Sequence, residues 1–287
     1  GALHAIAAVH NLLAAVVDNS MHFDNPLDLD PDRVTWRRTL DVCDRQLRNC
    51  EAGLGSKFDG FPHSTGFDIV AASEVMTIMA LAKDMEDLRV RLGRIVVGYN
   101  RSGKPVFARE LNCIGSLCVI LKDAPKPNLV QTTEHTPVMI HCGPFGNIAH
   151  GCNSVRATKM ALKLAPYVVT EAGFAADLGA EKFLNIKCRK ANIQPSCVVV
   201  VATIRALKMH GGVKKDNLKN YTCTGKFVIF PLQIGNFFLL CNQCLNITKK
   251  LVMKSITNNK HNTCVFEWAS SNPSRLCSRA VPIAPPC

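Results

Sequence analysis

The stretch PVMIHCGPFGNIAHGCNSVRATKMALKL, residues 137–164, contains the pattern that decides the fold. It begins with a short apolar run over 137–141, which is typical of a buried strand. A loop rich in glycine and other small residues follows, and residues 153–164 then have the composition of a helix. The stretch is therefore predicted to be a strand–loop–helix unit.

Three further stretches repeat this order of an apolar run, a short connection and a helical segment. They are 67–70 with 71–83, 167–170 with 179–183, and 198–203 with 205–210. Strands that are apolar at nearly every position are usually covered on both faces. The units therefore predict an α/β fold with a parallel sheet flanked by helices. Ligands of such sheets bind at the carboxyl ends of the strands, where the polar loops lie.

The segments before the first of these units are assigned from the same periodicity. Residues 5–17 are apolar and predict a buried helix. Asp30 and Pro31 then supply a cap and a first-turn proline for a second, amphipathic helix. Its apolar face is formed by Trp36, Leu40, Cys43 and Leu47. Residues 50–66 are rich in Gly, Ser and Phe and predict a loop.

Composition and charge narrow the class of protein. The chain has 287 residues, of which 47% are hydrophobic and 20% charged, and this excludes a disordered tail protein or a collagen-like chain. No run of 18 apolar residues occurs, so no membrane partner is expected. The 14 cysteines are irregularly spaced and no signal peptide precedes them, which indicates reduced thiols in an intracellular protein.

The formal net charge of +12 is concentrated near the end of the chain. Residues 217–287 hold eight Lys or Arg and a single acidic residue, Glu267. This segment lacks a repeated basic–aromatic pattern, so no nucleic-acid partner is expected. Its apolar bursts also have no helical or strand period. We therefore divide the chain into a domain over 1–219 and an irregular, Cys-rich basic tail over 220–287.

Two motifs admit both a functional and a structural interpretation. Residues 98–104 have the spacing of a phosphate-binding loop, but Pro105 and a second strand-like run follow where a helix is required. A hairpin with its turn at 100–103 is therefore favoured. Cys241 and Cys244, followed by His261 and Cys264, have the approximate spacing of zinc ligands, but the surrounding sequence gives this motif no support.

Titratable residues gather at the predicted strand ends. His141, Cys142, His150 and Cys152 surround one glycine-rich loop, which either binds a metal or, as we favour, turns its backbone amides toward an anion while both histidines are hydrogen-bonded.

The next two loops also carry charged groups. Glu171 and Asp177 either hold magnesium or act as a base, or they cap the following helix. Arg205, Lys208 and His210 suit an anionic ligand, the alternative being a solvated helix face.

Several of these segments resemble the formate–tetrahydrofolate ligase family. The similarity runs through GFDIVAASEVM (66–76), RLGRIVVGY (91–99), KPNLVQT (126–132), GPF (143–145), NIAHGCNS (147–154), VVTEAGF (168–174) and VATIRALKMHGG (201–212). It covers residues 1 to about 219. The resemblance implies a nucleotide-binding domain of the P-loop NTPase type, homo-oligomers, and ATP-dependent ligation of formate to tetrahydrofolate through formyl phosphate, giving 10-formyltetrahydrofolate.

The resemblance also implies ligands and a location. The implied ligands are ATP, magnesium, tetrahydrofolate as a substrate, and a monovalent cation. The implied location is the cytoplasm, with mitochondria as the alternative. We predict catalytic contributions from His141, Asn147, His150 and Glu171. Substrate or phosphate contacts are predicted for Asp68, Gly143, Asp177, Arg205, Lys208 and His210. No residue is predicted to be a metal ligand.

The sequence also departs from the family pattern. The family's phosphate loop lies upstream of Gly1, and its later segments are not recognisable after residue 219. In the strand-end loops Cys142, Gly146 and Ala175 stand where the family usually has other small residues. We therefore expect a truncated chain that is inactive alone and is doubtful as a homo-oligomer. The alternatives are a non-catalytic interaction protein and a non-functional truncated copy.

Overall fold

The computed structural model describes residues 1–173, 175–203, 209, 212–217 and 263–267. These fall into two compact units, Gly1–Asn192 and Ile193–Cys287. The first unit is a mixed α/β structure, and the described side chains that form the two candidate sites below belong to it. In the second, β10 (Val199–Thr203) pairs antiparallel with β11 (Thr263–Glu267), so a strand occurs within the segment 220–287.

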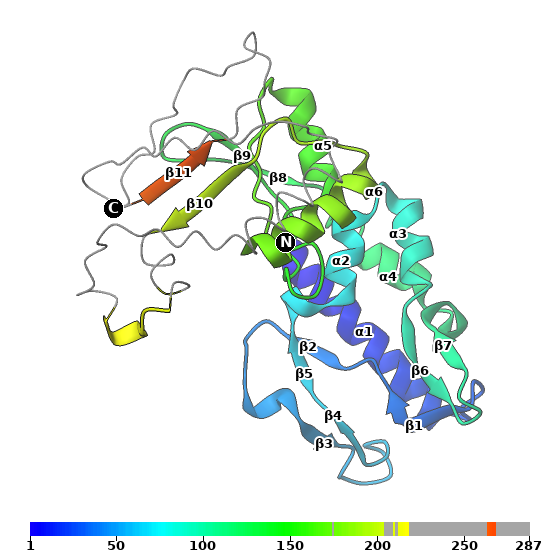
Figure 1. Cartoon of the computed structure of the whole chain (residues 1–287). Helices are drawn as coiled ribbons and strands as arrows, with labels where there is room; N and C mark the ends of the chain where they lie inside the picture. The colour runs from blue at the N-terminus through cyan, green and yellow to red at the C-terminus, as the bar shows by residue number, and fades with distance from the viewer. Residues whose placement is uncertain (174, 204–208, 210–211, 218–262, 268–287) are drawn as a thin grey trace. The chain divides into compact units, whose positions relative to one another are not determined.

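Helix α1 (Ala2–His22) is the central element of the first unit. Its buried residues, Ile6, Val9, His10, Leu13, Ala14 and Val17, recur at helical spacing and form one side of the core. Helices α2 (Glu74–Leu81) and α4 (Ile114–Ile120) pack against it, and α3 (Met85–Leu92) packs against both of these (Figure 1). By length and composition alone α1 could span a membrane, but its apolar face is already buried in this core.

The helices begin at polar caps that the sequence supplies. Asp84 accepts a hydrogen bond from the Asp87 amide at 2.8 Å, and Ser73 accepts one from the Val75 amide at 3.1 Å. Ser154 caps α5 (Val155–Leu164) by accepting from the Ala157 amide at 3.0 Å. Each cap satisfies a backbone donor that has no partner within its own helix.

The strands form small, separate sheets. Strands β1 (Leu29–Val34), β6 (Val96–Asn100) and β7 (Pro105–Phe107) make an antiparallel sheet in the order β1-β6-β7. Antiparallel pairs also join β3 (Cys50–Ala52) to β4 (His63–Thr65), and β8 (Asn128–Gln131) to β9 (Pro137–Ile140). Among the described strands of the first unit, only β2 (Arg38–Leu40) and β5 (Phe67–Ile69) pair in parallel.

The predicted parallel sheet flanked by helices is therefore not the arrangement of the described strands. Most of them pair with a neighbour in sequence through a short connection, and this produces antiparallel ladders. The predicted strand over 167–170 is also absent, and Tyr167 and Val169 are exposed by 83% and 98%. The hairpin interpretation of residues 94–107 is confirmed, since β6 and β7 flank a turn in which the Gly103 amide donates to the Asn100 carbonyl at 2.8 Å.

The predicted amphipathic helix after Asp30 is wrong. Residues 29–40 are mostly extended, and Pro31 lies in β1, at the edge of its sheet, where a missing backbone donor is tolerated. Trp36 is buried because its ring stacks on His10, with centroids 4.0 Å apart, while its indole N–H donates to the His10 carbonyl at 3.0 Å. Contacts with α1 thus override the local helical pattern.

The hairpin of β8 and β9 carries apolar side chains that the first unit leaves uncovered. Every residue of β8 is exposed, and Leu129, Val130 and Ile140 are exposed by 61%, 41% and 53%. The strands lead directly into the loop at 141–154, so the hairpin positions one side of the site described next.

Candidate functional site

Two glycine-containing loops lie against each other at the end of β9. The first runs from His141 to the cap of α5, and the second comprises residues 171–173, with the π-helical segment Ala175–Ala180 following after one residue that the structure does not describe. A methyl group on Gly151 would lie 2.6 Å from the Cα of Gly146, and one on Gly173 would lie 3.1 Å from the Cα of Gly179 and 3.2 Å from the His150 carbonyl oxygen. Gly151 and Gly173 also have positive φ angles of 67° and 88°. Only glycine fits such close backbone contacts in this conformation.

His141 connects this loop to two other segments. Its Nε2 lies 2.8 Å from the Ala124 carbonyl oxygen and must therefore donate, while its Nδ1 lies 2.6 Å from Oγ of Ser154. Burial lowers the pKa of His141, so the ring is neutral and Nδ1 accepts from the serine hydroxyl. Both ring nitrogens are thus engaged, as predicted for this histidine, and the side chain fixes the start of α5.

His150 is fully buried but lacks such partners. Neither ring nitrogen has a hydrogen-bond partner among the described residues, which differs from the prediction that both histidines are satisfied. Burial, and next the positive charge of Lys187, lower the pKa of His150 to about 4. The backbone of Asn153 acts in the opposite direction and raises the pKa, but it does not form a hydrogen bond with either ring nitrogen. His150 is therefore a neutral imidazole with one free donor and one free acceptor.

Lys187 supplies the buried positive charge beside this imidazole. The side chain is fully buried, and its Nζ donates to Oδ1 of Asn153 at 2.6 Å. It also lies 5.5 Å from the centre of the Phe183 ring and interacts with the Cys152 thiol. Among the side chains that the structure describes, no carboxylate lies within 4.0 Å of Nζ. Burial lowers the pKa of Lys187, as expected for a cation without a counter-charge.

The remaining predicted residues on these loops are placed as follows. Gly143 and Asn147 are exposed on the first loop. Glu171 is exposed on the second, yet its charge acts on Cys152, whose pKa is raised mainly by burial. Asp177 lies in a π-helical segment, Ala175–Ala180, in which its side chain is not described. The loops that carry Asn147, His150 and Glu171 are therefore neighbours.

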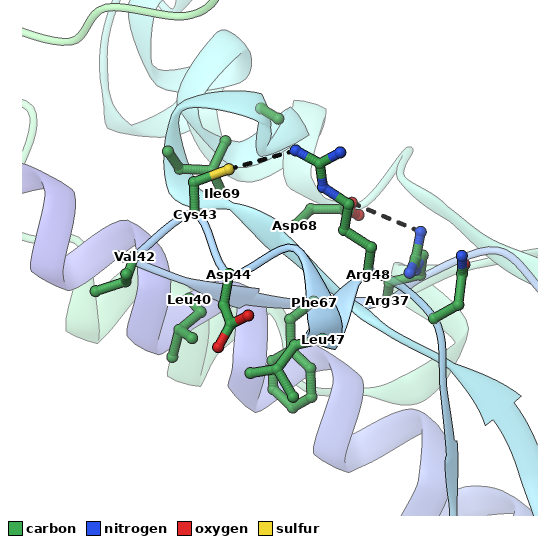
Figure 2. A pocket seen from close by; sticks show the side chains of 12 residues that line it. Arg37, Leu40, Val42, Cys43, Asp44, Leu47, Arg48, Phe67, Asp68 and Ile69 are labelled. Carbon is green, nitrogen blue, oxygen red and sulfur yellow. Dashed lines mark hydrogen bonds and ion pairs between the residues drawn. The ribbon is translucent and has the colours of Figure 1, made fainter.

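Other predicted residues lie elsewhere or outside the described part. Asp68 belongs to β5, where its carboxylate lies 3.7 Å from Nη1 of Arg37 beside a separate pocket (Figure 2). Arg205, Lys208 and His210 are outside the described residues, as are Cys241, Cys244 and His261 of the zinc motif. Across the described residues, no three His, Cys, Asp or Glu side chains are grouped to hold a metal.

The sequence contained a signal for Lys187 that the prediction missed. Lys187 stands among Phe183, Leu184, Cys188 and Ala191, all of which are buried. The spacing of these residues places position 187 on the same helical face. A lysine at a core position of a helical pattern therefore indicates a buried cation, and such groups gather at functional sites.

The profile of the formate–tetrahydrofolate ligase family matches residues 1–225. The formate–tetrahydrofolate ligase of Cereibacter sphaeroides is 62% identical over 218 residues, and that of Pelagibacter ubique is 59% identical over 219 residues. Each alignment covers 76% of this chain and 39% of the relative. The protein of the same name from Methylobacillus flagellatus is 62% identical over 212 residues. This chain therefore spans about two fifths of the length of these relatives.

Proposed function

Because this chain belongs to the formate–tetrahydrofolate ligase family, we propose that it forms part of an enzyme that ligates formate to tetrahydrofolate at the expense of ATP. The proposed intermediate is formyl phosphate and the product is 10-formyltetrahydrofolate. Formate, the intermediate and the released phosphate are all anions. A site for them needs positive charge and hydrogen-bond donors that are already in place.

The observation that supports this role is the buried ammonium of Lys187. A charge without a counter-ion is costly to bury, and an anionic ligand at the adjoining loops would offset that cost. Its hydrogen bond to Asn153 fixes the position of the positive charge. The neutral ring of His150 adds one donor and one acceptor at the same place.

We assign the other loop residues supporting roles in the same site. Gly143 and Asn147, exposed on the first loop, would contact the substrate, and Glu171 would act from the facing loop. Asp177, Arg205, Lys208 and His210 remain proposals for substrate or phosphate binding. His141 would position the loop through its two hydrogen bonds.

The described residues do not supply every group that the reaction needs. Residues 98–104 form a hairpin turn, so the phosphate loop of the proposed P-loop domain is not found there. Across the described part, no cluster of side chains fits magnesium, and we assign no ligand to it or to a monovalent cation. We propose a cytoplasmic location and a homo-oligomeric enzyme. The relatives named above are bacterial and give a mitochondrial location no support.

Phosphonoformate tests the anion site, because it joins a carboxylate to a phosphonate in a stable compound. Calorimetric titration of the full chain should show saturable binding, weakened about tenfold or more in Lys187→Met, as expected for the loss of a charged partner. Lys190 is exposed three residues later, so Lys190→Met is the matched control and should bind like the parent. Equal affinity in the Lys187 and Lys190 variants would refute the role of Lys187.

A second measurement addresses the activity of the chain. We expect no 10-formyltetrahydrofolate when the purified chain is incubated with formate, ATP and tetrahydrofolate, because its described residues lack a phosphate loop. Chromatography of the folate products gives the result directly. Product that depends on all three substrates would contradict this expectation, whereas the titration above would still report on the anion site.

A further inference from the structure

A second candidate site lies away from the glycine loops, beside the parallel pair β2–β5. The pocket has a volume of about 390 Å³ and is bounded by these strands and by the short 3-10 helix Gln46–Arg48 (Figure 2). Its size falls in the range of pockets that hold small organic molecules. None of the functions proposed above requires it.

Two guanidinium groups line this pocket, and among the described residues neither donates a hydrogen bond to an oxygen acceptor. Nη1 of Arg37 forms an ion pair with Oδ1 of Asp68 at 3.7 Å, which is longer than a hydrogen bond, whereas Nη2 is buried against Gly66, out of reach of a ligand in the pocket. Arg48 donates from Nη2 to Sγ of Cys43 at 3.6 Å, and a thiol is a weak acceptor. Figure 2 shows the side chain of Arg37 pointing toward Asp68 and that of Arg48 pointing toward Cys43. Nη1 of Arg37 and the guanidinium of Arg48 therefore retain hydrogen-bonding capacity for an oxygen ligand.

The remaining walls restrict what that ligand can be. Leu40, Leu47 and Phe67 give the pocket an apolar side, and Leu40 is still 37% exposed. Asp44 and Asp68 balance the two arginines, so the pocket has no excess positive charge for a polyanion such as phosphate. A planar carboxylate matches the fork of a guanidinium group, and an apolar ring would cover the exposed leucine.

We propose that this pocket binds a small aromatic carboxylate, with its carboxylate held by Arg37 and Arg48 and its ring against Leu40, Leu47 and Phe67. The site is distinct from the loops that carry Lys187. Its ligand is either the aminobenzoyl-glutamate part of tetrahydrofolate or a separate aromatic acid, since both present a ring and a carboxylate.

Calorimetric titration of the full chain with 4-aminobenzoate tests the proposal. We expect saturable binding, and we expect 4-aminobenzamide, which lacks the charge, to bind at least about tenfold more weakly. Arg48→Gln should weaken binding of the acid by a similar factor. Arg45 is exposed on the same segment and does not line the pocket, so Arg45→Gln is the matched control. An absence of saturation at about 10 mM, or equal binding of acid and amide, would overturn the proposal.

Two further readouts separate ligand binding from a structural effect. Asp44→Asn removes a nearby negative charge but keeps an oxygen that can accept from the Gln46 amide, so it should tighten binding of the acid. Bound 4-aminobenzoate should slow alkylation of Cys43, followed by peptide mass spectrometry, without slowing that of exposed Cys197. Unchanged alkylation of Cys43 would place the ligand elsewhere and refute the site.

Competition identifies the source of the ligand. Displacement of 4-aminobenzoate by tetrahydrofolate would assign the pocket to the substrate of the proposed ligase. Binding of 4-aminobenzoate that tetrahydrofolate does not affect would assign it to a separate aromatic acid. Because this site does not include Lys187, failure of the phosphonoformate titration would leave the result interpretable.

Discussion

Acidification should destabilise the first unit through His10, which α1 buries against Ser73 and Trp36. Its Nδ1 lies 2.8 Å from Oγ of Ser73, and its Nε2 lies 3.0 Å from the Arg37 carbonyl oxygen. Burial lowers the pKa of His10 to about 4, although the Arg37 carbonyl and the charge of Asp68 oppose the shift. In the unfolded chain the same group titrates near the ordinary value of about 6.5.

The sign and size of the effect follow from these two pKa values. Between pH 6.5 and about 4, the unfolded chain binds a proton at His10 that the folded chain does not. The contribution of neutral His10 to the free energy of unfolding is therefore fully present above pH 6.5 and is lost as the pH falls toward 4. One pKa unit corresponds to about 1.4 kcal/mol, so His10 alone should remove about 3 kcal/mol from the free energy of unfolding. His150, with a similar pKa, should add a comparable loss.

Urea unfolding at a series of pH values, followed by Trp36 fluorescence in a Trp268→Phe background, measures this dependence. His10→Gln keeps an amide that can donate to the Arg37 carbonyl and accept from Ser73, but it cannot be protonated. Its stability should fall by about 3 kcal/mol less than that of the parent over the same pH range. His4→Gln, at an exposed position of α1, should retain the parent's dependence. Identical pH dependence in the parent and His10→Gln would refute this reasoning.

Two other substitutions test the glycine loops and the cap of α5. Gly151→Ala should lower the free energy of unfolding by more than about 2 kcal/mol, because its φ is positive and the new methyl group would meet the backbone of Gly146. Gly115 lies in α4 with open space around it, so Gly115→Ala should be neutral or stabilising by up to about 1 kcal/mol. Equal effects of the two substitutions in urea unfolding would contradict the close-contact argument. Ser154→Ala removes both the helix cap and the partner of His141, so it should lower the free energy of unfolding by about 2 kcal/mol. A free energy from thermal unfolding that is unchanged within about 0.5 kcal/mol would show that the cap is dispensable.

Local patterns predicted those elements that a helical periodicity or a turn signal identifies within the segment itself. The helix over 5–17 is present as part of α1, and the turn at 100–103 follows from the positions of Asn100 and Gly103. The first strand-end loop was found because its glycines and its capping serine are themselves turn signals. In these cases the residues that form an element also carry the periodicity or the turn signal that identifies it.

Elements that depend on distant partners were predicted less well. The segment after Asp30 has a helical pattern, but Trp36 is held by His10, and Leu29 pairs with Asn100. Spacing along the chain gives no information about such partners. The same reason explains why the pocket at Arg37 was not foreseen, since its walls come from residues 37–49 and from β5. Lys187 could have been found, because its position in a buried helical pattern was visible.

The hairpin of β8 and β9 has a consequence for the fate of the chain in a cell. Among the strands that the structure describes, β8 and β9 pair only with each other, so each has one edge without a partner strand, and apolar side chains such as Leu129 and Ile140 are exposed beside it. Chaperones bind segments of this kind, and other chains can add to such edges. We therefore expect capture of the β8–β9 hairpin by the quality-control machinery to lower the abundance of the protein, in addition to the effect of core stability.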